Sequence, residues 1–212
     1  MRLLTAVVTC AIACSAVAAQ AQQLLLGGRI GRTSAMQHLS DPSFDYGRRE
    51  GLSTGVAATL ELRSWFALEM EGLYAEKGAR IDGFYEMRID YLDVPLLARV
   101  ASPVALYNLR PFLVAGLAPS VELHCSGYTT NPVAYSSSSN PPGTVPLNCD
   151  DQRRHHTDRG EVFGGGILLN RGRMQFTAEF RRTRGQDISG YDCCQLRNDV
   201  TSILIGASHR LH

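Results

Sequence analysis

The stretch Gly51–Leu62, with the sequence GLSTGVAATLEL, alternates between two kinds of side chain. Its even-numbered positions are mainly apolar, and its odd-numbered positions are small or polar. A period of two places the two sets on opposite faces of a β-strand. The same alternation recurs over 66–74, 173–181 and 201–208. The sequence therefore predicts an all-β chain whose strands have one apolar and one polar face.

Eight strands are expected, at about 23–32, 48–62, 65–76, 86–100, 109–123, 159–170, 173–184 and 198–211. Short connections alternate strictly with mostly longer ones, and these longer ones span 33–47, 77–85, 124–158 and 185–197. All long connections then lie at one end of the molecule. Tight periplasmic turns, long outer loops and an even strand number are typical of outer-membrane barrels. We predict an eight-stranded antiparallel up-and-down transmembrane β-barrel with long extracellular loops.

The first residues have the pattern of a secretory signal peptide. Arg2 supplies a positive charge, Leu3–Val17 is an apolar run, and Ala19-Gln20-Ala21 fits an A-x-A cleavage site. We predict a cleaved signal over 1–21 and a barrel domain over 22–212. A membrane anchor and a lipoprotein are the alternatives, although the apolar run is short for a spanning helix of roughly 20 residues.

The charge composition excludes two classes of protein. The 212 residues include 21 Lys+Arg and 20 Asp+Glu, which gives a formal net charge of +1. A protein that binds nucleic acid through its charge would carry a large basic excess. A highly charged disordered chain would also show a strong imbalance. We therefore expect a folded domain without a nucleic-acid partner. We also expect the barrel to be a monomer.

Alternation alone does not decide which face of the barrel is inside. A membrane barrel has its polar face inside, whereas a soluble lipocalin-like or avidin-like barrel has its apolar face inside. The predicted polar face carries charges of both signs, on Glu61, Glu69, Glu71, Asp90, Asp93, Arg99, Arg110, Glu122, Arg173, Glu179 and Arg181. We expect these side chains to pair as a network that fills the narrow lumen. A soluble periplasmic ligand-binding barrel and a narrow channel remain alternatives.

Three of the expected strands carry motifs that resemble a known family. Leu73–Gly78 (LYAEKG), Tyr91–Arg99 (YLDVPLLAR) and Pro111–Pro119 (PFLVAGLAP) are similar to strand motifs of the PorT-like outer-membrane β-barrel domain family. The resemblance extends from about Gly27 to the C-terminus, and YLDVP is its most specific part. It implies a small barrel of the OmpX and OmpA type in the cell outer membrane.

Pro95 lies inside the expected strand 86–100. A proline there removes a donor from the ladder and favours a bulge or an edge. The parity of the apolar positions also changes nearby, from Met87, Ile89 and Tyr91 to Leu92, Val94, Leu96 and Ala98. We therefore expect a β-bulge near 91–92.

Four cysteines follow the predicted signal peptide. Cys125 and Cys149 flank most of the long connection 124–158, and Cys193 and Cys194 lie in the last long connection, at the same end of the barrel. An exported protein meets an oxidising compartment, so we expect disulfides among these four. Cys125–Cys149 with Cys193–Cys194 is the favoured pairing, and bridges that link the two loops are the alternative.

The long outer connection also offers residues for binding or chemistry. Arg153, Arg154, His155 and His156 could contact lipopolysaccharide phosphates. The histidines and cysteines at this end could bind zinc, but C-x-x-C and H-x-x-x-H spacings are absent. Serine, histidine and aspartate at the rim could form a hydrolase site, but the long connection 124–158 contains no G-x-S-x-G nucleophile elbow.

The sequence therefore predicts a non-enzymatic outer-membrane protein without a cofactor. We expect a structural or surface-interaction role through the extracellular loops. Its expected partners are outer-membrane lipid, lipopolysaccharide, and an extracellular or envelope protein. The alternatives are an outer-membrane enzyme with a site at the loop rim and the soluble ligand-binding barrel.

Overall fold

The computed structural model describes residues 23–39, 47–81, 85–130, 144–146, 156–187 and 196–211. Ten strands form one sheet: β1 (Gln23–Leu39), β2 (Arg49–Arg63), β3 (Phe66–Ile81), β4 (Tyr85–Asp93), β5 (Leu96–Ala101), β6 (Leu109–Thr130), β7 (Thr144–Pro146), β8 (Thr157–Arg171), β9 (Met174–Asp187) and β10 (Leu196–Arg210). Among these residues, no helix is long and apolar enough to cross a bilayer. The predicted signal peptide, 1–21, lies outside the described residues.

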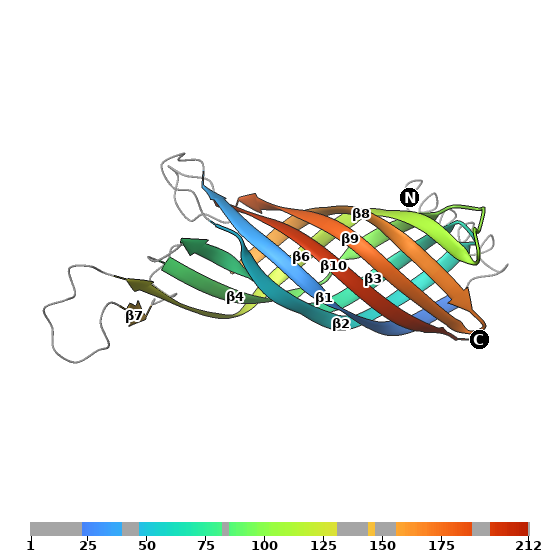
Figure 1. The fold of residues 1–212 in the computed structure, drawn as a ribbon, viewed down its shortest axis with the longest axis horizontal. Coiled ribbons are helices and arrows are strands. Elements are labelled where there is room, and N and C mark those ends of the chain that lie inside the picture. Colours follow the sequence, from blue (N-terminus) through green and yellow to red (C-terminus); the bar gives the residue numbers. More distant parts are fainter. Residues whose placement is uncertain are drawn as a thin grey trace, which may run out of the picture.

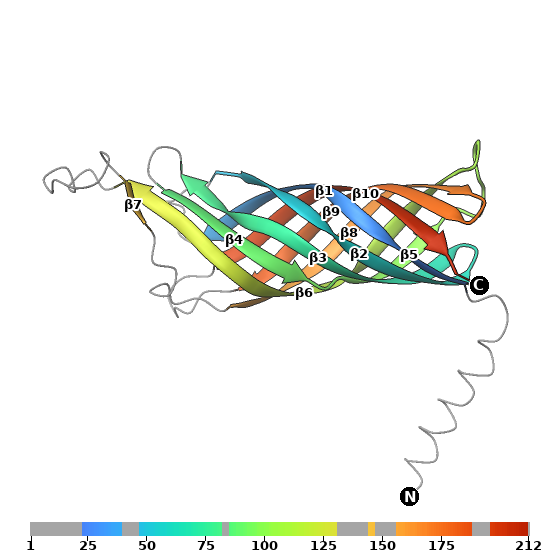
Figure 2. The ribbon, with the colours of Figure 1, turned by 90° about the horizontal axis from the view of Figure 1, so that it is seen from below.

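The sheet closes on itself, because β1 pairs with both β2 and the last strand, β10. β4 and β5 share one position in the ring, since both pair with β3 on one side and with β6 on the other. β7 lies off the ring and pairs with the outer end of β6. The predicted eight-stranded up-and-down barrel is therefore confirmed. Figures 1 and 2 show its strands winding obliquely around one elongated cylinder.

The two ends of the cylinder differ, as the connection lengths predicted. The tight turns and the C-terminus lie at one end, and β4, β6 and β7 extend at the other (Figures 1 and 2). Between β5 and β6, Leu106 and Leu109 exchange two backbone hydrogen bonds of 2.9 Å. Tyr107 and Asn108 between them have φ angles of 53° and 66°. Two positive φ angles define a type I′ hairpin turn.

Several strands run further at the outer end than the alternation predicted. β1 reaches Leu39, β3 reaches Ile81 and β6 reaches Thr130. In these extensions the outward positions are no longer regularly apolar, as Arg80 and Ser126 show. The backbone pairing continues where the contact with lipid ends, so the apolar pattern stops before the strand does.

The β-bulge lies in β6, opposite the position expected from the sequence. The β4–β6 register shifts between Asp90, opposite His124, and Tyr91, opposite Glu122, so Leu123 is the extra residue. The bulge brings Cys125 against the buried side chains of β4, which are Met87, Ile89 and Tyr91. β4 keeps its odd-numbered side chains inside, and the strand breaks at Val94-Pro95.

The polar face lines the interior and the apolar face lies outside. Glu71 and Arg181 are only 2% and 3% exposed, whereas Val56 is 67% and Leu113 is 69% exposed. Soluble monomers rarely expose such large apolar patches. The arrangement is that of a membrane barrel and the reverse of the soluble barrel that the sequence left open.

Candidate functional site: a sealed interior and an outer rim

Buried ion pairs fill the centre of the barrel. Arg29 of β1 lies with its Nε 3.0 Å from Glu71 Oε1, and its Nη2 also contacts Glu69. Arg181 of β9 donates from Nη2 to Glu71 Oε1 at 2.9 Å and to Glu179 Oε2 at 3.0 Å. Because each charge has an opposite partner, the low-dielectric interior can hold them.

The same network continues toward the end that holds the turns. Arg99 of β5 places its Nη1 3.2 Å from Glu69 Oε2 and its Nη2 3.7 Å from Glu61 Oε1. Glu61 accepts a hydrogen bond of 3.0 Å from Gln175 and pairs with Arg210 at 3.2 Å. The network therefore links β1, β2, β3, β5, β9 and β10 through side chains.

Gly206 of β10 leaves the space that Arg29 occupies. The two residues are opposite each other in the β1–β10 register. A Cβ atom at Gly206 would lie 2.2 Å from Arg29 Nη1 and 2.7 Å from Thr177 Oγ1. Arg29 was not predicted as an interior residue, because the glycines around it hide the alternation of this strand. Its sequence signal is an arginine among the apolar and small residues of 24–31.

A second interior layer lies nearer the outer end. Lys77 of β3, the only lysine of the sequence, lies 2.8 Å from Asp93 Oδ1 and donates to Ser120 Oγ at 3.3 Å. Its Nζ also lies 4.6 Å from the centre of the Tyr91 ring. Between Lys77 and Arg181 the described side chains leave a cavity of about 20 Å³. Such a cavity has room for about one water molecule.

Some residues of the predicted interior set lie elsewhere. Arg173 is exposed in the turn before β9, because the alternation was extended one residue beyond the strand. Arg110 lies at the turn end, where it donates to the carbonyl oxygens of Ser102 at 2.8 Å and Ser64 at 2.5 Å. Placing Arg173 and Arg110 in the central network was therefore wrong.

Asp90 also departs from the prediction, because it lies on the outward side of β4. Arg88 of the same strand donates to Asp90 at 2.9 Å, to Tyr74 at 3.0 Å and to Glu76 at 2.8 Å. This cluster lies beyond the apolar belt, which ends on β4 at Leu92. Burial by itself raises the pKa of Asp90, but the hydrogen bonds from Arg88 and Tyr74 outweigh it and lower the net pKa.

At the outer rim, Glu122 lies 3.4 Å from His156 Nδ1 and donates its backbone N–H to the His156 carbonyl at 2.8 Å. The rest of the predicted contact patch, Arg153, Arg154 and His155, lies outside the described residues, as do Cys149, Cys193 and Cys194. Within the described ranges, no three His, Cys, Asp or Glu side chains are placed to share a metal ion.

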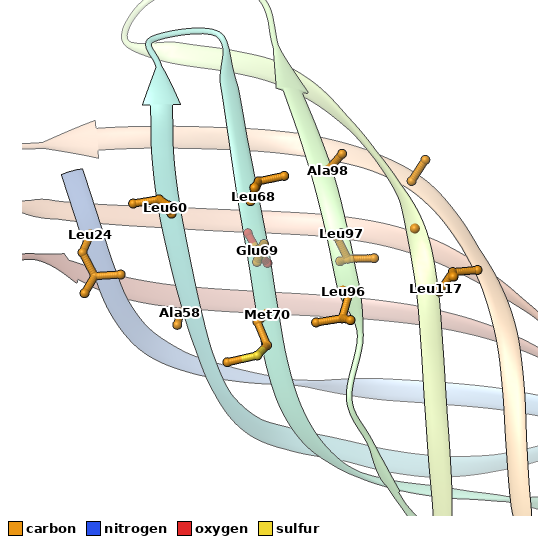
Figure 3. A pocket seen from close by; sticks show the side chains of 12 residues that line it. Leu24, Ala58, Leu60, Leu68, Glu69, Met70, Leu96, Leu97, Ala98 and Leu117 are labelled. Atoms are coloured by element: carbon orange, nitrogen blue, oxygen red, sulfur yellow. The ribbon is translucent and has the colours of Figure 1, made fainter. Parts of the chain in front are cut away.

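The outer face of the barrel has an apolar groove of about 530 Å³ (Figure 3). It is lined by Leu24, Leu60, Leu68, Met70, Leu96 and Leu117, with the small Ala58, Ala98, Ala115 and Gly116 between them. Glu69 lies behind β3 in the same view, on the inner side. Consecutive residues of one strand thus face hydrocarbon on one side and buried ion pairs on the other.

The closed sheet, the charged interior and the apolar exterior define the class of protein: a membrane-spanning β-barrel. Residues 19–185 match the family model described as outer membrane protein beta-barrel domain. The chain belongs to this family, and its location is the cell outer membrane.

Three solved structures are similar to this chain. OprG of Pseudomonas aeruginosa is similar with a TM-score of 0.53 at 10% identity, over 91% of this chain and 97% of OprG. Neisserial surface protein A is similar with a TM-score of 0.49 at 10% identity, over 86% of this chain and 95% of that protein. Ail of Yersinia pestis is similar with a TM-score of 0.45 at 9% identity, over 88% of this chain and 98% of Ail. The similarity to OprG supports the fold alone. No curated protein matches the sequence.

Proposed function

We propose that this chain is a non-enzymatic outer-membrane protein, in which a sealed barrel anchors extended outer strands that make surface contacts. The observation that carries the proposal is the pairing of the interior charges. Arg29, Glu71 and Arg181 hold one another at the centre. A group that is held by buried ion pairs is poorly placed to bind substrate or transfer a proton. The function then belongs to the outer end.

The outer rim supports contacts with anionic lipid and with proteins. β8 begins at Thr157, so Arg153, Arg154 and His155 precede it directly, and His156 is exposed beside Glu122. Guanidinium groups bind phosphate in a bidentate manner. We propose that this run contacts lipopolysaccharide phosphates, and that an extracellular or envelope protein is a second class of partner for the same rim.

Three further features belong to the proposal. The chain is exported by the signal over 1–21, works as a monomer, and falls in the PorT-like branch of the barrel family. Cys125 bridges to Cys149, and Cys193 to Cys194. A bridge over the long outer connection would stabilise the fold by about 3–4 kcal/mol in the loop-closure model. Cys125 lies near the outer end of β6, the strand that leads into the connection with Cys149.

The test begins with the full chain in the outer-membrane fraction, run unboiled and boiled on a denaturing gel. A folded barrel shifts its mobility on boiling. Binding to lipopolysaccharide vesicles is then compared for the wild type, the double variant R153A/R154A and R173A. Arg173 lies at the opposite end, so R173A serves as the control.

We expect R153A/R154A to lose binding and R173A to retain it. Equal binding by all three proteins would contradict the lipid contact. A hydrolytic activity that is lost in His156→Ala would contradict the non-enzymatic proposal, and steady unitary conductance in planar bilayers would contradict the sealed interior.

A further inference from the structure

The β2–β3 turn places an arginine on the membrane-facing side of the barrel. The β2–β3 register shifts at Leu62, which is an extra residue, so Arg63 lies opposite Phe66. Phe66 belongs to the outward set of β3, which continues with the exposed Leu68. Directly opposite residues share one face of a sheet. The bulge therefore puts Arg63 on the outward face, at the edge of the apolar surface.

Two arginines at this turn carry charges that no carboxylate of the described residues compensates. Arg63 is exposed and, in the part of the chain that the structure describes, forms no ion pair. Arg110 of β6 donates to the carbonyl oxygens of Ser64 at 2.5 Å and Ser102 at 2.8 Å. These hydrogen bonds hold Arg110 against the turn and leave its charge in place. The turn therefore presents two positive charges beside the apolar belt.

The apolar groove of Figure 3 begins next to this turn. Leu60 and Leu68 line the groove and are opposite each other, as the next outward pair of β2 and β3 after Arg63 and Phe66. Successive outward positions of a strand are only about 7 Å apart. The groove has a volume of about 530 Å³ and extends across β5, where Ala98 lies opposite Leu68. A positive group at one end of an apolar groove matches a molecule with an anionic head and a hydrocarbon chain.

We propose that the turn and the groove bind one anionic glycerophospholipid, with its phosphate on Arg63 and one acyl chain in the groove. Guanidinium groups bind phosphate through two parallel hydrogen bonds, and Arg110 adds a second positive charge. The tight turns of such barrels face the periplasm, so the lipid belongs to the periplasmic leaflet. The site lies at the opposite end from the lipopolysaccharide contact of the proposed function and does not rest on it.

Trp65 reports on this site, because it is the only tryptophan of the sequence and its ring lies 5.8 Å from that of Phe66. Bromine atoms on an acyl chain quench the fluorescence of a nearby indole. The folded full chain in uncharged maltoside micelles is titrated with brominated phosphatidylglycerol and, separately, with brominated phosphatidylcholine. We expect saturable quenching in the wild type, with an affinity for phosphatidylglycerol that is higher by about fivefold or more.

Two variants separate the head of the lipid from its chain. Arg63→Gln should lower the affinity for phosphatidylglycerol to that for phosphatidylcholine. Ala98→Leu fills part of the groove and should weaken the binding of both lipids by about fourfold, with the preference between them retained. The control is Arg173→Gln, which removes an exposed arginine at the same end, in the turn before β9. β8 and β9 are separated from β2 and β3 by other strands on both sides of the ring.

Three results would overturn the proposal. They are equal affinities of the wild type for the two lipids, an equal loss of preference in Arg173→Gln, and an unchanged affinity for both lipids in Ala98→Leu. The first two would mean that Arg63 holds no headgroup, and the third that the groove holds no bound chain. If Ala98→Leu shows no mobility shift on boiling, Ala115→Leu, which lines the same groove, takes its place.

Discussion

Arg29 of β1 lies with its Nε 3.0 Å from Glu71 Oε1 of β3, although β2 separates the two strands in the sheet. The contact therefore passes through the interior of the barrel and does not follow the hydrogen-bonded sheet. Hydrogen bonds between neighbouring strands define the circumference of the barrel. Ion pairs such as this one connect strands across its lumen and close it.

Replacing Arg29 with methionine should be strongly destabilising. It leaves the buried Glu69 and Glu71 with only Arg99 and Arg181 as cations, and breaking a buried pair costs about 3–5 kcal/mol. Urea unfolding in lipid vesicles measures the loss. The control is Arg32→Met, which removes an exposed pair with Glu50 at 3.7 Å and should cost less than about 1 kcal/mol. Similar losses for both variants would show that the interior network is not a source of stability.

Gly206→Ala should destabilise the barrel through Arg29. The new Cβ would lie 2.2 Å from Arg29 Nη1, and the buried ion pairs prevent this side chain from moving aside freely. Overpacking of this kind costs about 1–3 kcal/mol. Gly28→Ala is the matched control, since its Cβ meets only Gly55 O at an ordinary 3.7 Å. If Gly206→Ala unfolds at the same urea concentration as Gly28→Ala, Arg29 does not occupy this space.

Lys77 allows a chemical test of the sealed lumen. It is the only lysine of the sequence, and its side chain is 4% exposed. An amine-reactive reagent should modify the α-amino group of the folded barrel and leave Lys77 unmodified. After boiling, mass spectrometry should find Lys77 labelled as well. Rapid labelling of Lys77 in the folded protein would mean that solvent reaches the interior.

Ile205→Arg tests which face meets the membrane. Ile205 is 59% exposed and lies opposite Ile30 in the middle of the apolar belt. An arginine on the lipid face near the midplane costs about 2–4 kcal/mol. Val104→Arg, in the exposed connection between β5 and β6, should change the free energy of unfolding by less than about 0.5 kcal/mol. Folding titrations into lipid vesicles compare the two, and equal stabilities would contradict the membrane-facing assignment.

Tyr107→Asn should stabilise the β5–β6 hairpin. The φ angle of 53° at Tyr107 is costly for a bulky side chain, whereas asparagine adopts it readily. We expect a gain of up to about 1 kcal/mol, measured by urea unfolding. Tyr107→Pro fixes φ near −65° and should therefore destabilise the hairpin. A gain with proline would show that the turn is not of type I′.

Within the apolar belt, most of the fold could be predicted from the sequence. A strand between lipid and a charged lumen must alternate apolar and polar side chains, and Gly51–Leu62 shows this alternation directly. The prediction failed where the surroundings change. Beyond Glu76, water replaces lipid, so the pattern of β3 ended although the strand continues to Ile81. Lys77 was consequently assigned to a loop, and it lies in the interior.

The polarity of a residue alone could not decide whether it lies in the lumen or at a rim of the barrel. Glu69 and Glu71 lie on the inner face within the belt, where alternation identifies them. Asp90, Arg110 and Arg173 have the same residue types but lie near strand ends, where charged side chains are equally favourable in water. Arg29 shows the opposite failure. Its strand contains several glycines, which have no side chain that could show an alternation of polar and apolar positions. That Arg29 lies opposite Gly206 was therefore visible only in the structure.

The bulge at Leu123 has a consequence for the part of the protein outside the membrane. It turns Cys125 inward, onto Met87, Ile89 and Tyr91, so β4 and β6 carry a small hydrophobic core of their own above the lipid. The projecting strands therefore form a platform that is stabilised in part by contacts made outside the bilayer. Substitutions in the outer connections can change what the platform presents without disturbing the barrel that holds it.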